Sequence, residues 1–210
     1  MKITIIGAGG NIGRRIVKEA ATRNHELKLI TSKPKTFFEL EKAEIQEGDI
    51  FDEKTLTRQI EGSDLVISAY APPHEDTKLL IAASQHLVAA AKKANTRLIA
   101  VGGAGSLKVS ETTQLVDTPN FPEEYKAIAL VHREALENIY QKENDLNWTN
   151  VSPSAYIFEG ERTNSFRIGE NELLVNDKGE SAISMEDFAI GILDEAENTK
   201  FNRKRFTIGY

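Results

Sequence analysis

The sequence predicts an α/β fold with one domain, residues 1–210, built on a doubly wound parallel sheet. Two observations predict it. Strand-like apolar runs alternate with helical patterns through the first half of the chain, and the first run passes through glycines directly into a helix. Alternating strands and helices favour a parallel sheet covered by helices on both faces, because each crossover between parallel strands needs a long connection.

A glycine-rich turn joins the first strand to the first helix. The strand at residues 2–6 leads into Gly7, Gly10 and Gly13, a G-x-x-G-x-x-G pattern, and apolar residues at helical spacing follow. Gly7 permits a tight turn, Gly10 allows a close approach of backbone to phosphate, and Gly13 lets the helix pack on the strand. A helix that begins in this way predicts a dinucleotide-binding site.

Four further strands and three helices complete the first half. The strands are expected at residues 27–31, 44–48, 65–69 and 98–101. The helices are expected at residues 37–43, 53–61 and 76–94, the last with leucine and alanine along one stripe.

The second half departs from strict alternation. We expect a loop at 102–120, a helix at 122–142, a strand at 148–152, an irregular segment at 153–169, a hairpin at 172–183 and a helix at 186–197. Ser184 opens a capping sequence for that last helix. Ligands of open α/β sheets lie beyond the carboxyl ends of the strands, so the segments 102–120 and 153–183 are expected to form the substrate side.

Composition narrows the class of protein. A net charge of −6 without a basic cluster argues against nucleic acid as a partner. No apolar run is long enough to cross a bilayer and the chain opens on a strand, so we expect no membrane partner and a cytoplasmic location. Cysteine is absent and the four histidines are far apart, so no metal site is expected. The classes of protein that remain are an enzyme and a small-molecule binder. The sequence does not decide between monomer and homodimer.

Motifs over nearly the whole length resemble one group of proteins. They are the turn at 7–13, GDI at 48–50, DLVISAY at 64–70, VGGAGSL at 101–107, VSPSA at 151–155, GERT at 160–163 and ISMED at 183–187. In these motifs the chain resembles the biliverdin reductase B-like atypical short-chain dehydrogenase/reductases, often labelled NADH-flavin reductases, which have a Rossmann-like fold. The resemblance implies a nicotinamide cofactor, hydride transfer and a small-molecule acceptor.

The resemblance also implies which residues hold the cofactor. Asp49 and Ile50 would meet the adenine, although an alternative role for Asp49 is to cap the next helix, for which Asp52 is the better candidate. The other expected contacts are Gly7, Gly10, Asn11, Ile12 and Gly13 at the phosphates, Ser68, Ala69 and Tyr70 at the centre, and Val101, Gly102, Gly103, Pro153, Ser154 and Ala155 around the nicotinamide.

The residues after the second strand bear on the choice between NADP and NAD. The stretch from Thr31 to Lys35 holds no acid for a ribose 2′-hydroxyl. Relatives commonly carry an arginine near Ser32, which this chain lacks. Lys33 would supply a charge and Ser32 a hydroxyl for a 2′-phosphate, so NADP is favoured and NAD stays possible. The alternative is that Lys33 lies in a solvated turn.

Catalytic residues are harder to assign. Standard short-chain dehydrogenases use a Tyr-x-x-x-Lys pair, but here Tyr125 is followed four residues later by Ala129, and the first hydroxyl after the fifth strand is Ser106. Candidate helpers are Ser106, Tyr125 and Tyr156, with Arg162 as a contact for an anionic substrate. The alternatives are that Tyr125 is a core residue and Ser106 a loop hydroxyl.

These residues favour an NADPH-dependent reductase that delivers hydride to a planar conjugated acceptor such as a flavin or a quinone. The reduced forms of such acceptors take a proton from water, so the protein mainly orients donor and acceptor. The alternative is a non-catalytic redox sensor that binds the dinucleotide, resembling the NmrA-like regulators. An epimerase or dehydratase is disfavoured because it needs the missing tyrosine-lysine pair.

Overall fold

The computed structural model describes residues 1–32 and 43–210, and its centre is an eight-stranded sheet in the order β3-β2-β1-β4-β5-β6-β10-β8. The strands are β1 (Lys2–Ile6), β2 (Glu26–Thr31), β3 (Ala43–Glu47), β4 (Leu65–Ser68), β5 (Arg97–Val101), β6 (Trp148–Ser152), β8 (Arg167–Gly169) and β10 (Lys204–Gly209). All pairs in this sheet are parallel except β10 with β8. The predicted doubly wound parallel sheet is therefore confirmed.

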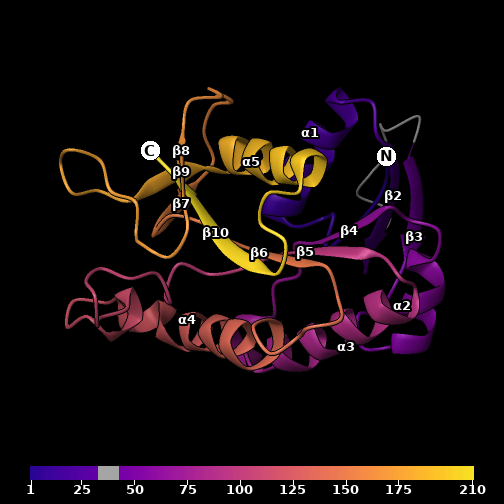
Figure 1. Cartoon of the computed structure of the whole chain (residues 1–210), viewed down its shortest axis with the longest axis horizontal. Helices are drawn as coiled ribbons and strands as arrows, with labels where there is room; N and C mark the ends of the chain where they lie inside the picture. The colour runs from indigo at the N-terminus through magenta and orange to yellow at the C-terminus, as the bar shows by residue number, and fades with distance from the viewer. Residues whose placement is uncertain (33–42) are drawn as a thin grey trace.

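Helices cover both faces of the sheet (Figure 1). On one face lie α1 (Asn11–Thr22) and α5 (Met185–Asn198), and on the other α2 (Glu53–Ile60), α3 (Leu79–Lys93) and α4 (Glu123–Ala135). Successive strand residues point to opposite faces, so Ile67 packs in the core with α1 and α5, whereas its neighbour Val66 packs in the core with α2 and α3. Burial on both faces explains why the central strands read as continuous apolar runs.

The predicted strands of the first half are present, one helix begins later than predicted, and the helix expected at 37–43 stays a prediction. The helix expected from residue 76 is preceded by a separate 3₁₀ turn at His74–Asp76, and α3 itself begins at Leu79. Six of the seven residues of the helix expected at 37–43 lie outside the described residues.

The prediction of a hairpin at 172–183 is wrong. A tight turn does form, because the Asn176 N–H donates to the Glu180 carbonyl at 2.9 Å, but the flanking strands pair elsewhere. The strand β9 (Ala182–Ser184) pairs in parallel with β7 (Tyr156–Phe158), and β8 pairs with β10. The segment between the turn and its flanks is largely exposed, so its few apolar residues gain more by packing against other strands than against each other.

The last two helices lie close to their predicted bounds. The helix expected at 122–142 is α4 followed by a short π-helical turn at Leu136–Tyr140. Ser184 caps α5 as predicted, since its hydroxyl accepts a hydrogen bond from the Asp187 N–H at 3.0 Å.

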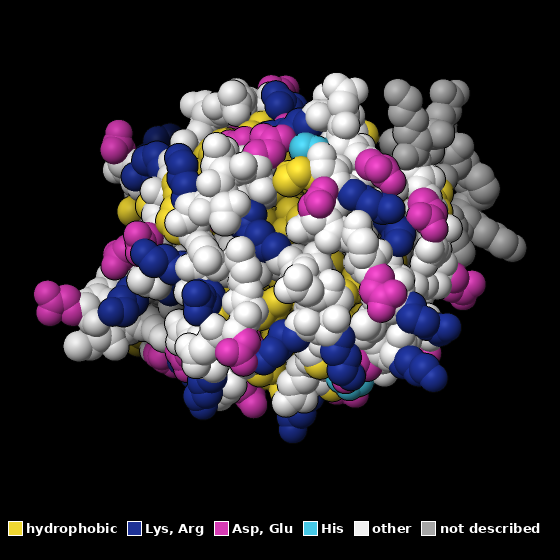
Figure 2. Space-filling view, turned by 45° about the vertical axis from the view of Figure 1, so that its right-hand side comes forward, with side chains coloured by type: hydrophobic (Ala, Val, Ile, Leu, Met, Phe, Trp, Pro, Cys, Tyr) yellow, Lys and Arg dark blue, Asp and Glu magenta, His cyan; other side chains and the backbone are white. Residues whose placement is uncertain are grey.

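The surface carries both signs of charge. Lysine and arginine side chains are interspersed with aspartate and glutamate over the face seen in Figure 2, with hydrophobic side chains visible between them. Within the described part of the chain, no helix combines the length and apolar character that a membrane span requires.

Candidate functional site

An open cleft of about 940 Å³ lies at the carboxyl ends of β1, β2, β3 and β4. Seven of the predicted cofactor residues line it: Gly7, Gly10, Ser32, Asp49, Ile50, Ala69 and Tyr70. Parallel strands end at one edge of the sheet, so residues distant in the sequence meet there. The cleft also has lining residues that the sequence did not predict, among them Arg14, Glu47 and Phe51.

Glycine is required at two positions of the turn. Gly7 has φ +74°, and a Cβ there would lie 2.7 Å from the Ala69 carbonyl oxygen. A Cβ on Gly13 would lie 2.1 Å from the Gly7 carbonyl oxygen, because the helix packs directly on the turn. Gly10 differs, since among the described residues a Cβ there would meet only that same oxygen, at 3.4 Å. Gly10 is thus compatible with a side chain as far as the fold is concerned.

The beginning of α1 is left open on the side of the cleft. Its N-cap is Gly10, which has no side chain to accept a hydrogen bond, and the first turn contains no acidic residue. The first N–H groups of a helix have no acceptor within the helix, and together they carry partial positive charge. This end of α1 therefore suits a phosphate. Asn11 and Ile12, two of the predicted contacts, occupy this first turn with Gly13.

The loop after β3 forms the other end of the cleft. Asp52 caps α2 by accepting a hydrogen bond from the Thr55 N–H at 3.0 Å, which confirms Asp52 as the helix cap. Asp49 accepts a hydrogen bond from the Phe51 N–H at 2.9 Å through one carboxylate oxygen. It is therefore held in a local turn at the cleft wall and does not cap the helix.

Two aromatic rings form part of the cleft wall. Phe51 and Tyr70 meet edge to face, with centroids 6.1 Å apart and an interplanar angle of 89°. Burial raises the pKa of Tyr70, and the charges of Asp49 and Asp76 raise it further. The Tyr70 phenol is therefore protonated and neutral near pH 7.

Beneath the ends of β4, β5 and β6 lies a small polar cavity of about 10 Å³, whose lining includes Ser68, Tyr70, Val101, His132, Tyr140 and Asn150. Burial lowers the pKa of His132 to about 4 and raises that of Tyr140 to about 12. Both side chains are therefore neutral near pH 7.

The turn after β5 packs too closely for side chains. The Gly102 N–H donates to the Val151 carbonyl at 2.8 Å, and a Cβ on Gly102 would lie 2.2 Å from Asn150 Oδ1. A Cβ on Gly103 would lie 2.9 Å from His132 Cβ. The two glycines let the chain cross β6 and α4 in close contact.

The segment after β6 is held by hydrogen bonds. The buried Ser154 hydroxyl donates to the Ile208 carbonyl at 3.0 Å, and the Ala155 N–H donates to Ser181 Oγ at 3.1 Å. Pro153, also buried, begins this segment at the carboxyl end of β6.

Ser106 lies in a buried cluster around Arg205. Arg205 Nη1 donates to Ser106 Oγ at 3.2 Å, and Nε and Nη2 donate to Asn171 Oδ1 at 3.1 and 2.8 Å. Burial lowers the pKa of Arg205 to about 10, and the guanidinium remains charged near pH 7. The Lys108 N–H also donates to the Asn171 carbonyl at 2.8 Å, so the structure joins the segments 102–120 and 153–183.

Tyr125 and Tyr156 both lie on the surface. Tyr125 is 52% exposed and so is not the core residue considered as an alternative. Tyr156 is 65% exposed, and its ring stacks on Phe158 with centroids 5.4 Å apart and 14° between the planes. Neither tyrosine lines the cleft at the phosphate turn.

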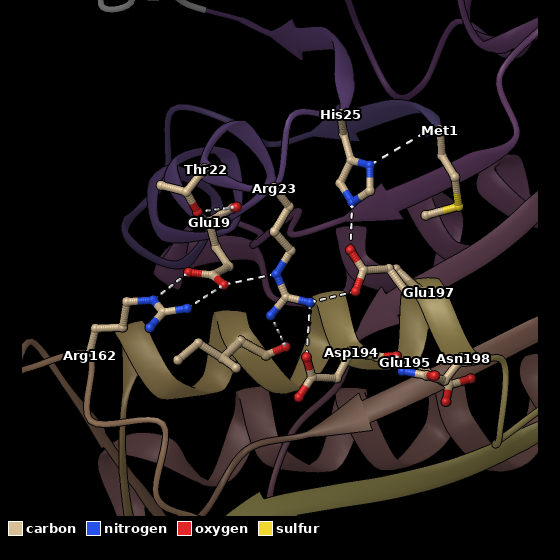
Figure 3. Close-up of polar contacts among 12 residues, drawn as sticks. Met1, Glu19, Thr22, Arg23, His25, Arg162, Asp194, Glu195, Glu197 and Asn198 are labelled. Carbon is tan, nitrogen blue, oxygen red and sulfur yellow. Dashed lines mark hydrogen bonds and ion pairs between the residues drawn. The ribbon is translucent and has the colours of Figure 1, made fainter.

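Arg162 is held by an acid of α1, as Figure 3 shows. Its Nε and Nη2 donate to the two carboxylate oxygens of Glu19 at 2.8 and 3.0 Å. Arg23 donates to the same carboxylate at 2.9 Å and also pairs with Asp194 and Glu197 of α5. Arg162 therefore connects the substrate-side segment to α1 rather than facing the cleft.

The motifs at 160–163 and 183–187 meet as one hydrogen-bonded unit. The fully buried Asp187 accepts from the Thr163 N–H at 2.8 Å, the Asn164 N–H at 2.9 Å and the Tyr210 hydroxyl at 2.9 Å. Ser184 Oγ donates to the Glu161 carbonyl at 2.9 Å. The two motifs therefore hold the segment after β7 against the start of α5.

The sequence contains a signal for Arg14, a residue of the cleft that was not predicted. Arg14 follows Gly13 directly, and a basic residue at the start of a phosphate-binding helix is a candidate contact for the ligand. Lys33, predicted to contact a 2′-phosphate, lies outside the described residues.

The residues present fit a dinucleotide. The uncapped start of α1 suits a pyrophosphate, and the cleft extends from there to the apolar Ile50 and the Phe51 ring, where a base can pack. Val101, Gly102 and Gly103 continue the same edge of the sheet toward β6.

Comparison with known proteins agrees with this geometry. The sequence model of the NAD(P)H-binding family matches residues 7–199. The chain is 40% identical to the uncharacterized protein YwnB of Bacillus subtilis (strain 168), over 99% of this chain and 98% of YwnB.

Two solved structures also match over the whole chain. A proposed NADH-flavin reductase from Streptococcus pneumoniae TIGR4 is 34% identical, with TM-score 0.90, covering 100% of this chain and 99% of that one. A proposed epimerase from Bacteroides thetaiotaomicron is 33% identical, with TM-score 0.94, covering 100% and 96%. The protein belongs to the NAD(P)H-binding family and has a Rossmann-like fold.

Proposed function

We propose that the protein is an NADPH-dependent reductase that delivers hydride to a planar conjugated acceptor of the flavin or quinone type. One observation carries the proposal: a single cleft brings together the glycine turn, the start of α1 and Asp49 with Ile50, an arrangement that suits a dinucleotide. Tyr70, His132 and Tyr140 line the small cavity below the ends of β4, β5 and β6, and all three are neutral near pH 7. These side chains offer no strong acid, which favours transfer of a hydride to an acceptor that needs none from the protein.

Different residues of the cleft would bind different parts of the cofactor. Gly7, Gly10 and the start of α1 would hold the pyrophosphate, and Asp49 with Ile50 would hold the adenine. Gly102 and Gly103, with the segment 153–155, would lie along the nicotinamide.

The bound cofactor supplies the hydride. The protein positions donor and acceptor, and good orientation lowers a barrier by several kcal/mol. The proton that completes reduction of a flavin or quinone would come from solvent, because Tyr125 and Tyr156 are exposed and Ser106 is engaged with Arg205. The reductase assignment of the Streptococcus pneumoniae protein supports the same class of reaction.

The test is oxidation of NADPH and of NADH by the full chain, followed by loss of nicotinamide absorbance. Riboflavin, FMN, menadione and biliverdin serve as acceptors, and Gly10→Val is the matched variant without a phosphate site. We expect faster oxidation of NADPH with at least one acceptor, and none with Gly10→Val. Tight NADPH binding without turnover on any acceptor would contradict the reductase and favour a redox sensor.

A further inference from the structure

Arg14 stands at the wall of the cleft with its guanidinium largely free. The side chain is exposed, and its Nε donates to the Gly9 carbonyl oxygen at 2.9 Å. That bond turns the side chain back toward the glycine turn, and both Gly9 and Arg14 line the cleft. Among the described residues no carboxylate forms an ion pair with Arg14, whereas the next residue, Arg15, pairs with both Glu159 and Glu186.

The sheet order indicates which part of a dinucleotide lies near Arg14. The strand β2 stands between β1, which leads into the glycine turn, and β3, which leads into Asp49. A dinucleotide with its pyrophosphate at the turn and its adenine at Asp49 therefore has its adenosine ribose over the end of β2. Thr31 and Ser32 form that end and line the same cleft as Arg14.

We infer that Arg14 binds the 2′-phosphate of NADP and sets the preference of this chain for NADP over NAD. The inference rests on the proposed cofactor site and names the residue that distinguishes the two cofactors there. A guanidinium held by one N–H still has two terminal nitrogens, which match two phosphate oxygens. Ser32 adds a hydroxyl at the same place.

The negative charge of Glu47 opposes the assignment of Arg14 to a 2′-phosphate. It is exposed at the end of β3, opposite Thr31 in the register, and it also lines the cleft. A carboxylate bonds a ribose 2′-hydroxyl and repels a 2′-phosphate. Arg14 therefore favours NADP as the cofactor, whereas Glu47 favours NAD.

Titration calorimetry with two nucleotides separates these possibilities without any turnover. The probes are adenosine 2′,5′-bisphosphate (2′,5′-ADP) and 5′-AMP, which differ only in the 2′-phosphate. We expect the wild-type chain to bind 2′,5′-ADP about 10- to 100-fold more tightly, the range of a charge-assisted hydrogen bond. Arg14→Ala should lose at least tenfold of that preference while 5′-AMP affinity stays within about twofold. Arg14→Lys should keep part of it.

Lys18→Ala is the matched control. Lys18 is an exposed residue one turn further along α1, outside the cleft lining, so its loss removes the same charge from the same helix. It should leave both affinities within about twofold. Because Arg14 is exposed, its variants should unfold at nearly the wild-type temperature, which circular dichroism checks.

Three outcomes would overturn the inference. Equal binding of the two nucleotides, or tighter binding of 5′-AMP, would show that Arg14 does not bind a 2′-phosphate, while the dinucleotide site would stand. An unchanged preference in Arg14→Ala would assign the 2′-phosphate to another group. If the wild-type chain bound neither nucleotide nor NADPH, the proposed function would fall together with the inference.

Discussion

Glu19 and Arg162 are 143 residues apart in the chain and form a two-bond ion pair, with Nε to Oε2 at 2.8 Å and Nη2 to Oε1 at 3.0 Å. Glu19 is buried within α1, the helix that begins at the glycine turn, and Arg162 lies between β7 and β8. The pair therefore connects the expected cofactor-binding element to the expected substrate-binding one (Figure 3).

Loss of this pair should lower stability moderately. Arg162→Ala removes two hydrogen bonds from a buried carboxylate that keeps Arg23 as a partner. The Arg162 side chain is 54% exposed, so solvent screening reduces the effect, and we expect a loss of about 1–2 kcal/mol in the free energy of unfolding. Urea denaturation measures it. Lys126→Ala, which breaks an exposed pair with Glu123, is the control and should cost less than about 0.5 kcal/mol. Equal losses in the two variants would contradict a connecting role for Arg162.

The same carboxylate should make stability depend on pH. The hydrogen bond from Arg162 is the main cause that lowers the pKa of Glu19 below its ordinary value of 4.5. A depressed folded-state pKa contributes stability that is fully present above the unfolded value and is lost as pH falls through the folded value. We expect the urea midpoint to fall below about pH 4.5 and to fall less steeply in Glu19→Gln. Parallel pH profiles for the two proteins would show that Glu19 does not contribute.

Asp187 should matter more for stability than for binding. It is fully buried and accepts hydrogen bonds from Thr163, Asn164 and Tyr210, so Asp187→Ala removes the acceptor that these three donors share. Because Thr163 and Asn164 are exposed residues, we expect a loss of about 1–3 kcal/mol, the cost of roughly one unsatisfied group. Denaturation gives this value. A loss below about 1 kcal/mol would mean that water replaces the carboxylate.

Two glycines of the turn should respond differently to an added side chain. Gly13→Ala places a Cβ 2.1 Å from the Gly7 carbonyl oxygen, so it should destabilise the fold by about 1–3 kcal/mol or more. Gly10→Val meets that oxygen at 3.4 Å and should fold, yet its side chain occupies the space of the pyrophosphate and should abolish dinucleotide binding. Thermal melts and calorimetry with NADPH test both. Undiminished NADPH affinity in folded Gly10→Val would remove the cofactor site from this turn.

Single hydroxyl groups should matter little for turnover. General acid catalysis by a positioned group contributes about 10²–10⁴-fold, so Tyr125→Phe, Tyr156→Phe and Ser106→Ala should each lower turnover by less than about tenfold if solvent supplies the proton. Steady-state rates with the best acceptor decide this. A thousandfold loss in Tyr125→Phe with unchanged NADPH affinity would identify Tyr125 as the acid.

The sequence by itself determined six of the eight strands of the sheet, the alternation of helices and the glycine turn, whereas β8 and β10 were not predicted. These features depend on local patterns: continuous apolar strands, helical periodicity, and glycines where backbone meets backbone. Capping by Asp52 and Ser184 was likewise readable, because a cap acts within three residues of its own position.

Only the tertiary structure decided which residues distant in the sequence become partners. Arg162 was expected at a substrate anion and instead pairs with Glu19, and Ser106 contacts Arg205, 99 residues away. The strand pairing of β7 with β9 likewise replaced the expected hairpin. A charged or polar side chain takes whichever partner the packed chain brings within about 3 Å, and no local pattern records that choice. The place of Arg14 in the cleft was also decided by the fold, which positions β2 between the glycine turn and Asp49.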